Sequence, residues 1–331
     1  MMRYVLGRSL AAVPLLWLAV TALFVVFLVI PGDPVSLLSG EQSISPDVRH
    51  AIEQKYGLDR PVLTRYGGFL ADLLQGDLGQ SYISGRNVGD MISEALPASL
   101  RLAFWAMMIE LCVGIGSGVL GAMRRHSATD VLLRAGTLCI MMVPAFLIGI
   151  GLQYLFGILP YRNGWPEAFR LPVQGIGPDT WFAFLIPAGE QWRYLLLPAI
   201  TLACVTAAVT SRLARASMIE TLQADFVRTL RAMGISGRRI LFNHALRNSL
   251  GPVISFVAVN IGRMLGSAVL VETIFGWPGM GSRIHQALVV RDAPVVMGFT
   301  VVLVVAFVLF NLLADVAHAV IDPRVRREAT A

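Results

Sequence analysis

Residues 295–320 are VVMGFTVVLVVAFVLFNLLADVAHAV, an apolar stretch that decides the class of fold. A bilayer core about 30 Å thick is crossed by roughly 20 helical residues, because an α-helix rises about 1.5 Å per residue. This stretch is long enough to cross it. Charged residues make up only 15% of the 331-residue chain, against about 25% in a typical soluble domain. The sequence therefore predicts an integral membrane protein.

Five further apolar blocks have a similar length, so we predict an all-α protein with six transmembrane helices. The expected spans are residues 9–30, 98–122, 131–159, 194–218, 250–272 and 295–320. The first block follows Arg3 and Arg8, as the apolar core of a signal peptide would. It is too long for such a core and ends in PGDP (31–34) without a small-residue cleavage site. We therefore interpret it as a retained span.

Basic residues predict the orientation of the spans, because short cytoplasmic loops carry an excess of Lys and Arg. They gather before the first span, between the second and third, after the sixth, and most densely between the fourth and fifth. The residues concerned are Arg3, Arg8, Arg124, Arg125, Arg212, Arg215, Arg228, Arg231, Arg238, Arg239, Arg247, Arg324, Arg326 and Arg327. We expect both termini to be cytoplasmic and three segments to be external.

The first external segment, which follows the first span, shows signals for two short helices. A helix is predicted from Ser45, a suitable N-cap residue, to Gly57, and a second from Pro61 to about Gln75. The connection 160–193 is rich in Pro, Gly and Trp. We expect it to form an irregular outer loop near the membrane interface.

Composition and motifs exclude several classes of function. The net charge of +6 is spread over inter-span segments, without the basic face of a nucleic-acid binder. The three cysteines lie in apolar blocks without metal-ligand spacing, and neither HExxH nor GxSxG occurs. We predict no catalytic residue and no metal site. The only lysine, Lys55, is predicted to be external, so a P-loop for ATP is excluded.

Gly114, Gly116 and Gly118 are interpreted as close-packing residues within a span.

The stretch 216–252, ASMIETLQADFVRTLRAMGISGRRILFNHALRNSLGP, is unusually long and polar for a loop between spans. Met218, Leu222, Phe226 and Leu230 recur at four-residue spacing, which predicts one helix with an apolar face. Gly234 ends that helix, and a second helix capped at position 236 runs toward residues 244–248. Such a unit is either a docking element for a partner or a solvated basic loop that only enforces topology.

At this stretch the sequence resembles the dipeptide, oligopeptide and nickel permeases of ABC importers. The resemblance extends over nearly the whole chain, and the order and spacing of its motifs make it specific. Its motifs are PGDP (31–34), GLD (57–59), GDLG (76–79), LPA (197–199), DFVRT (225–229) with Arg231, Ala232 and Gly234, HALRN (244–248), ETIFGWPG (272–279), RD (291–292), PVV (294–296) and DPR (322–324).

The resemblance implies a type I ABC importer permease fold in a bacterial cytoplasmic (inner) membrane. It implies an N-terminal span with an external helical segment (1–97), a permease domain (98–322) containing a cytoplasmic coupling loop (216–249), and a tail (323–331). The implied partners are a second homologous permease, two ATP-binding subunits, an extracytoplasmic solute-binding protein and the surrounding lipid. ATP and magnesium would be bound by the partner subunits, and this chain would carry no cofactor.

Carried onto this sequence, the resemblance implies that residues 225–234 form a coupling helix seated on an ATPase subunit. The implied coupling residues are Asp225, Phe226, Val227, Arg228, Thr229, Arg231, Ala232, Gly234, His244, Arg247 and Asn248. Leu230 and Met233 depart from the family pattern, and both make this helix more apolar. The solute is left open between short peptides, nickel, metal chelates and glutathione-like compounds.

Two charges inside predicted spans are further candidates for a functional role. Glu110 and Arg263 both fall near mid-depth, where an isolated charge costs about 2.5–3.5 kcal/mol on insertion scales. They are expected either to form a buried ion pair or, for Arg263, to meet a solute carboxylate in the translocation pathway. A secondary transporter working without ATPase subunits is the alternative of another class. It is disfavoured because no internal repeat is evident.

Overall fold

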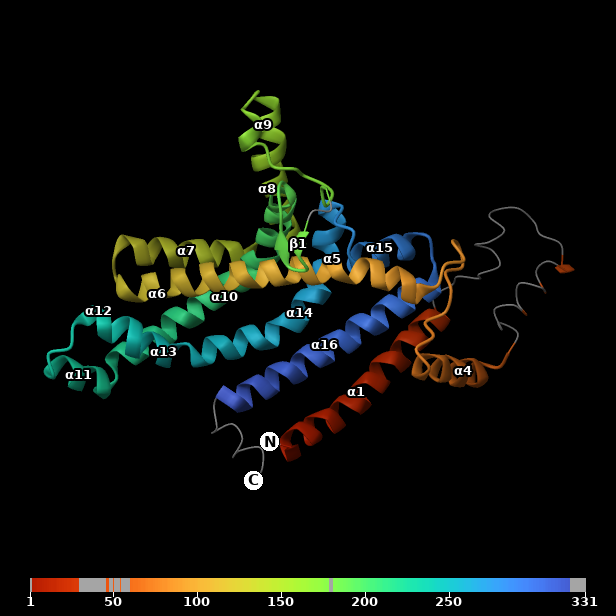
Figure 1. The fold of residues 1–331 in the computed structure, drawn as a ribbon, viewed down its shortest axis with the longest axis horizontal. Coiled ribbons are helices and arrows are strands. Elements are labelled where there is room, and N and C mark those ends of the chain that lie inside the picture. Colours follow the sequence, from red (N-terminus) through yellow and green to blue (C-terminus); the bar gives the residue numbers. More distant parts are fainter. Residues whose placement is uncertain are drawn as a thin grey trace.

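The computed structural model describes residues 2–29, 46–47, 50, 54, 60–178 and 181–321, and Figure 1 shows their arrangement. Within this part of the chain, six helices are long and apolar enough to cross a membrane. The elements are α1 (Met2–Val29), α4 (Val62–Leu74), α5 (Val88–Ile109), a π-helical segment (Glu110–Ile115), α6 (Gly116–Met123), α7 (Ala128–Met142), α8 (Ala145–Gln153), a second π-helical segment (Tyr154–Ile158), α9 (Leu159–Arg162), a 3₁₀ turn (Glu167–Phe169), β1 (Trp181–Ala183), β2 (Ile186–Pro187), α10 (Gln191–Gln223), α11 (Asp225–Ala232), α12 (Gly237–Arg239), a third π-helical segment (Ile240–Ala245), α13 (Leu246–Ser249), α14 (Gly251–Phe275), α15 (Met280–Val289) and α16 (Ala293–Ile321).

The predicted spans one, two, four, five and six are confirmed as helices α1, α5 with α6, α10, α14 and α16. The second is longer than expected, because α5 begins at Val88 and not near residue 98. Its start is capped by Asn87, whose side chain accepts a hydrogen bond of 2.7 Å from the Gly89 amide. These helices run roughly along the long axis of the molecule, with α11 and α12 at one end and α4 at the other (Figure 1).

The third predicted span, 131–159, is not one continuous helix. The chain leaves helical geometry at Val143, and Pro144, which has no backbone N–H, occupies the N-cap position just before α8. Helix α7 lies along α6 and α10, whereas α8 and α9 leave the bundle at a steep angle (Figure 1). The window long and apolar enough to cross a membrane is Ala145–Arg162. Pro144 therefore divides the predicted span into two helical segments.

Helix α10 is the centre of the bundle, in contact with α5, α6, α7, α8 and α14. Two glycines of the second span allow its close approach. A Cβ at Gly118 would overlap the Ser211 carbonyl oxygen, and one at Gly114 would lie 2.8 Å from the Thr210 Cβ. Close packing is therefore confirmed for these two glycines, whereas a Cβ at Gly116 would meet no atom within 4 Å.

Of the two short helices predicted after the first span, the second is confirmed as α4, which begins after Pro61 and ends before Gln75. It packs on the outer end of α1, where the ring of Phe24 lies 5.2 Å from Tyr66 and 5.7 Å from Phe69. The helix predicted between residues 45 and 57 lies largely outside the described residues. The outer loop 160–193 is irregular as predicted, with a small antiparallel pair of strands, β1 and β2.

Candidate functional site

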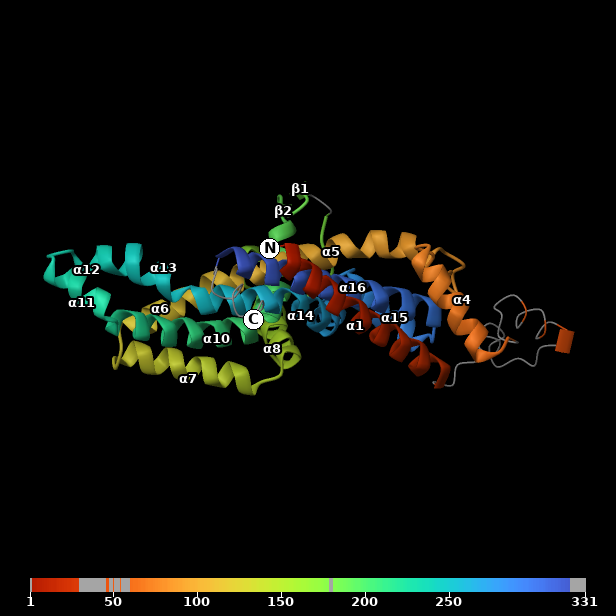
Figure 2. The same cartoon turned by 90° about the horizontal axis from the view of Figure 1, so that it is seen from below.

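The stretch predicted to be a docking element projects from one end of the bundle (Figure 2). We call residues 224–249 the cytoplasmic arm, after the side of the membrane predicted from the basic residues. The single helix predicted through Met218 and Leu230 is wrong, because α10 continues to Gln223 and the chain breaks at Ala224, which has an extended conformation (φ −64°, ψ 149°). Met218 therefore lies in the span, and Leu230 lies in the separate helix α11.

The turn after α11 and the helix that follows it agree with the prediction. Gly234 has a φ of +78°, a left-handed conformation that glycine adopts without steric strain. Ser236 occupies the N-cap position of α12, although its side chain makes no capping hydrogen bond. Residues 237–249, which comprise α12, the third π-helical segment and α13, form one continuous helical segment that we call the stalk. Residues 244–248 lie on this stalk.

The base of the arm is anchored by buried apolar side chains. Val227 of α11 is buried, as is Ile240 at the start of the stalk. Leu241 and Ala245 form a cluster with Met218 of α10 and with Ala122 of α6. The Ser217 hydroxyl also donates a 2.8 Å hydrogen bond to the Ser249 carbonyl. The arm is thus held firmly where it joins the spans.

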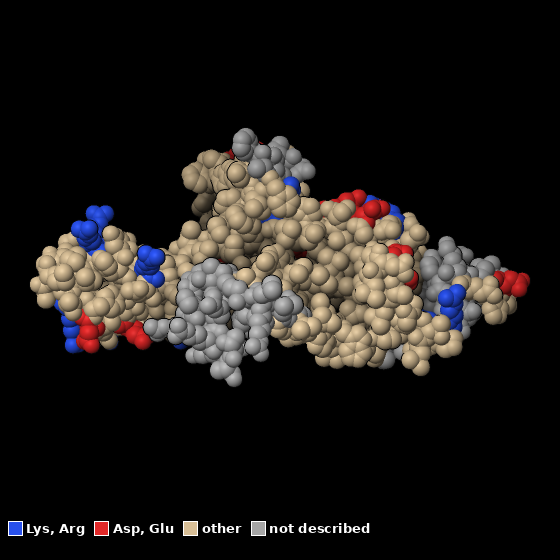
Figure 3. All heavy atoms as spheres, turned by 60° about the horizontal axis from the view of Figure 1, so that its bottom comes forward, with Lys and Arg blue, Asp and Glu red and all other residues tan. Residues whose placement is uncertain are grey.

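The outer face of the arm is uncovered in the isolated chain. Of the predicted coupling residues, Val227 is buried and His244 is partly buried, whereas the others are exposed: Asp225, Phe226, Arg228, Thr229, Arg231, Ala232, Gly234, Arg247 and Asn248. Phe226 is 38% and Met233 70% exposed. On the face shown in Figure 3, charged side chains gather mainly toward the two ends of the molecule. Apolar and basic groups together make this face suited to a protein partner.

An ion pair that sequence reasoning missed joins the third span region to α10 just before the arm. Arg215 binds the buried Asp130 with both ends of its guanidinium, Nε to Oδ1 at 2.6 Å and Nη2 to Oδ2 at 2.9 Å. The His126 amide donates to the same carboxylate at 3.2 Å. The Arg215 hydrogen bonds lower the pKa of Asp130 to about 2. The spacing Ser127-x-x-Asp130 is a capping-box signal that could have drawn attention to this aspartate.

The intramembrane pair considered from the sequence is not formed. Glu110 is buried and accepts a 2.7 Å hydrogen bond from the Thr210 hydroxyl of α10. Its second oxygen and the Asn260 amide nitrogen have no partner among the described residues. Arg263 is exposed and forms no ion pair within the part of the chain that the structure describes. Glu110 and Arg263 therefore belong to different environments, one inside the bundle and one on its surface.

A second buried carboxylate, Glu272, lies in the ETIFGWPG motif and had no role assigned from the sequence. Its Oε1 accepts a 2.6 Å hydrogen bond from the Ser99 hydroxyl, and its Oε2 accepts from the amides of Gly281 at 2.7 Å and Ser282 at 3.1 Å. These amides begin α15, so the carboxylate caps that helix. A Cβ at Gly279 would overlap the carboxyl group. We call residues 272–282 with Ser99 the external knot.

The family of the chain follows from the comparison with known proteins. A family model described as "Binding-protein-dependent transport system inner membrane component" matches residues 110–327. The chain belongs to this family. A second model, described as the N-terminal part of such a membrane component, matches residues 1–103. These matched ranges do not test the predicted domain boundaries, which stay predictions.

Curated relatives match the permease over most of their length. The probable D,D-dipeptide transport system permease protein DdpB of Escherichia coli K12 is 38% identical over 312 residues, 92% of either chain. The dipeptide permease DppB of Alkalihalophilus pseudofirmus is 33% identical, covering 98% of this chain and 100% of its own. The glutathione permease GsiC of Escherichia coli K12 is 31% identical, covering 98% and 99% respectively.

The family settles the general nature of the protein. The chain is a multi-pass inner-membrane permease subunit of an ABC importer, a transport component and not an enzyme. The predicted type I permease fold is confirmed. Its family works with ATPase and solute-binding protein partners.

Proposed function

We propose that the permease forms half of a translocation pathway for short peptides, together with one homologous permease subunit and two ATP-binding subunits. The relatives' printed solutes, dipeptides and glutathione, share peptide bonds and free carboxylates. Nickel or metal-chelate import by the same fold is the second candidate. Among the residues that the structure describes, no group of three or more His, Cys, Asp or Glu side chains could hold a metal ion, so none of these residues favours that candidate.

The observation that carries the proposal is the cytoplasmic arm, which has a buried base and a bare outer face. Residues 225–234 would seat on an ATPase subunit, with Phe226 in an apolar cleft and Arg231 near acidic groups. Nucleotide closure in the partner would then move the arm as a rigid lever and reshape the spans. ATP and magnesium would be held by the partner subunits, and both termini would be cytoplasmic, on the same side as the arm.

The test is to coexpress the permease with its partner subunits and to measure solute-stimulated ATPase activity and uptake in proteoliposomes. The double substitution Phe226→Ala with Arg231→Gln should reduce both by at least about tenfold, the effect of losing about 1.4 kcal/mol of coupling energy. Arg162→Gln, an exposed residue at the end of α9, is the matched control. Unchanged coupling after deletion of residues 225–234, or uptake by the isolated chain, would contradict the proposal.

Arg263 supplies a more specific expectation about the solute. It shares an exposed stripe of α14 with Val259, Gly266 and Leu270. A charge on a lipid-facing span costs about 2.5–3.5 kcal/mol, so this stripe is expected to border water. In the proposed pathway Arg263 would bind a peptide carboxylate with its planar guanidinium.

Transport of peptides with free or amidated C-termini distinguishes carboxylate binding by Arg263 from an ion pair between Arg263 and Glu110, which the structure does not contain. Arg263→Gln should raise the KM for free-acid peptides by about tenfold or more, the loss of one charge-assisted hydrogen bond. It should change the KM for C-terminal amides much less. Adding Glu110→Gln should not restore transport. Recovery of transport in the double variant would instead support pairing of the two residues.

A further inference from the structure

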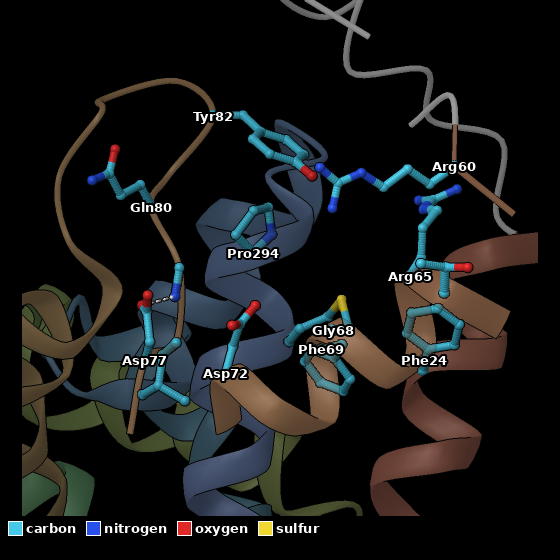
Figure 4. A pocket seen from close by; sticks show the side chains of 14 residues that line it. Phe24, Arg60, Arg65, Gly68, Phe69, Asp72, Asp77, Gln80, Tyr82 and Pro294 are labelled. Atoms are coloured by element: carbon cyan, nitrogen blue, oxygen red, sulfur yellow. Dashed lines mark hydrogen bonds between the residues drawn. The ribbon is translucent and has the colours of Figure 1, made fainter. Parts of the chain in front are cut away.

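A cleft of about 480 Å³ opens on the external side of the permease, between α1, α4, the start of α16 and the loop before α5 (Figure 4). Charged side chains of both signs line it, and they occupy opposite ends. Arg60 and Arg65 lie at one end, and Asp72 and Asp77 at the other (Figure 4). Within the part of the chain that the structure describes, none of the four forms an ion pair.

The cleft lies at the outer ends of two spans. Phe24, which belongs to the candidate span Leu10–Phe27, and Met297, at the beginning of Ala293–Ala314, both line it. Helix α4 is held at this height by the Phe24 ring contacts and by a 2.6 Å hydrogen bond between the Thr21 and Tyr66 hydroxyls. The charged walls are therefore at the level of lipid headgroups in the outer leaflet.

Helix α4 has the three sectors expected of a helix lying in the membrane interface. One sector, with Tyr66 and Phe69, packs on α1. A second, with Arg65 and Asp72, lines the cleft. The third is bare: Leu63 and Leu74 are 83% and 89% exposed on neighbouring positions of the same face. Exposed leucines on the side of α4 opposite its charged face indicate insertion into the acyl boundary of a bilayer.

The charge pattern matches one headgroup chemistry. A guanidinium binds a phosphate through two parallel hydrogen bonds, so the Arg60 and Arg65 end suits a phosphodiester. Carboxylates accept hydrogen bonds from a primary ammonium. Asp72 is exposed, and Asp77 uses one oxygen, Oδ1, to accept a 2.8 Å hydrogen bond from the Gly79 amide. Acceptor capacity for an ammonium therefore remains at that end.

We propose that this cleft binds the headgroup of a zwitterionic phospholipid with a primary ammonium, of the phosphatidylethanolamine type, and so fixes α4 and the outer end of α1 in the membrane. A free peptide carries the same pair of charges, but it has no acyl chains to lie against Val13 and Trp17, which share the face of α1 that carries Phe24 and are 61% and 55% exposed. The proposal is independent of the solute and of the ATPase partners.

The assembled importer, purified in mild detergent and reconstituted in nanodiscs, provides the test. Native mass spectrometry and lipid extraction should find about one phosphatidylethanolamine per permease chain in mixed membranes of phosphatidylethanolamine, phosphatidylcholine and phosphatidylglycerol. Arg60→Gln with Arg65→Gln should lower retained phospholipid at least about fivefold. Asp72→Asn with Asp77→Asn should abolish the preference for phosphatidylethanolamine over phosphatidylcholine, whose trimethylammonium cannot donate hydrogen bonds. Arg162→Gln is the control.

Two outcomes would overturn the inference. Equal lipid retention by the arginine double variant and the control would show that no headgroup is bound by these residues. Displacement of the retained lipid by millimolar dipeptide, but not by glycerophosphoethanolamine, would assign the cleft to solute. Thermal unfolding of each variant, compared with the wild type, separates a lost binding site from a misfolded chain, and a variant that unfolds early is replaced by the corresponding single substitution.

Discussion

The cytoplasmic arm and the external knot are similar in local construction and opposite in environment. Each follows a long span, turns at a glycine with positive φ (Gly234 at +78°, Gly276 at +57°) and starts a short helix. In the knot, the Glu272 carboxylate satisfies two buried amides and a hydroxyl within the chain itself. In the arm, the polar groups of α11 point outward, and only its base is buried.

The difference shows which region of this permease completes its hydrogen bonds within the subunit. The external knot completes its hydrogen bonds with α5 and α15, so its shape is determined inside the subunit. The arm leaves Phe226, Met233 and several arginines uncovered, as expected of a surface that contacts another protein. The knot completes its hydrogen bonds within the chain, whereas the arm leaves a face exposed for a partner. This arrangement suits a permease that is moved by subunits on one side of the membrane. Three predictions test this contrast, ordered by their expected effect on stability.

The largest effect is expected from removing the carboxylate of the knot. Glu272→Ala leaves the Ser99 hydroxyl and the amides of Gly281 and Ser282 buried without an acceptor. Each unsatisfied group should lower the free energy of unfolding by about 1–3 kcal/mol. Thermal unfolding of the purified importer, followed by fluorescence, should show a clearly lowered midpoint. Gly279→Ala should do the same by forcing the carboxyl group aside. The control is Glu94→Ala, which removes an exposed carboxylate of α5. An unfolding midpoint equal to that of the wild type for Glu272→Ala would show that this carboxylate does not stabilise the knot.

An intermediate effect is expected at the Asp130–Arg215 pair, which joins α7 to α10 a few residues before the arm. The pKa of Asp130 is lowered to about 2, whereas an unperturbed aspartate titrates near about 3.9. The stabilisation is therefore complete above the unfolded pKa and is lost as the pH falls from about 4 toward 2. Asp130→Asn should lower the unfolding midpoint at pH 7 and flatten its pH dependence between about pH 4 and 2. A variant with the wild-type acid profile would show that another carboxylate governs it.

The smallest effect on stability is expected in the arm, where neighbouring residues point in opposite directions. Val227→Ala removes buried methyl groups and should destabilise α11 by about 1–2 kcal/mol, detected as faster proteolysis after α10 and weaker ATPase coupling. Arg228→Gln breaks only an exposed 3.4 Å pair with Asp225. It should shift the unfolding midpoint by no more than about 1 °C while still reducing coupling. Equal proteolysis rates for the two variants would mean that Val227 does not anchor the arm.

Much of the fold was predictable because it depends on local pattern. Pro61 and Gly76 mark the ends of α4, and Gly234 marks the turn of the arm, through conformational preferences that act within a few residues. The same kind of reasoning failed at Ala224, because nothing in its chemistry prevents a helix, and the break appears only where α10 leaves the bundle. It also failed to divide the third span at Val143, because a proline within an apolar run is compatible with a kink.

The amino-acid sequence by itself determined the membrane class and five of the six spans, since long apolar runs must be buried in lipid whatever they pack against. Only the tertiary structure decided the partners of the charged groups. Asp130 meets Arg215 across 85 positions, Glu110 meets Thr210 across 100, and Glu272 meets Ser99 across 173. Such contacts depend on the rotation and height of one helix against another, and a one-residue change in helix phase turns a side chain by about 100°.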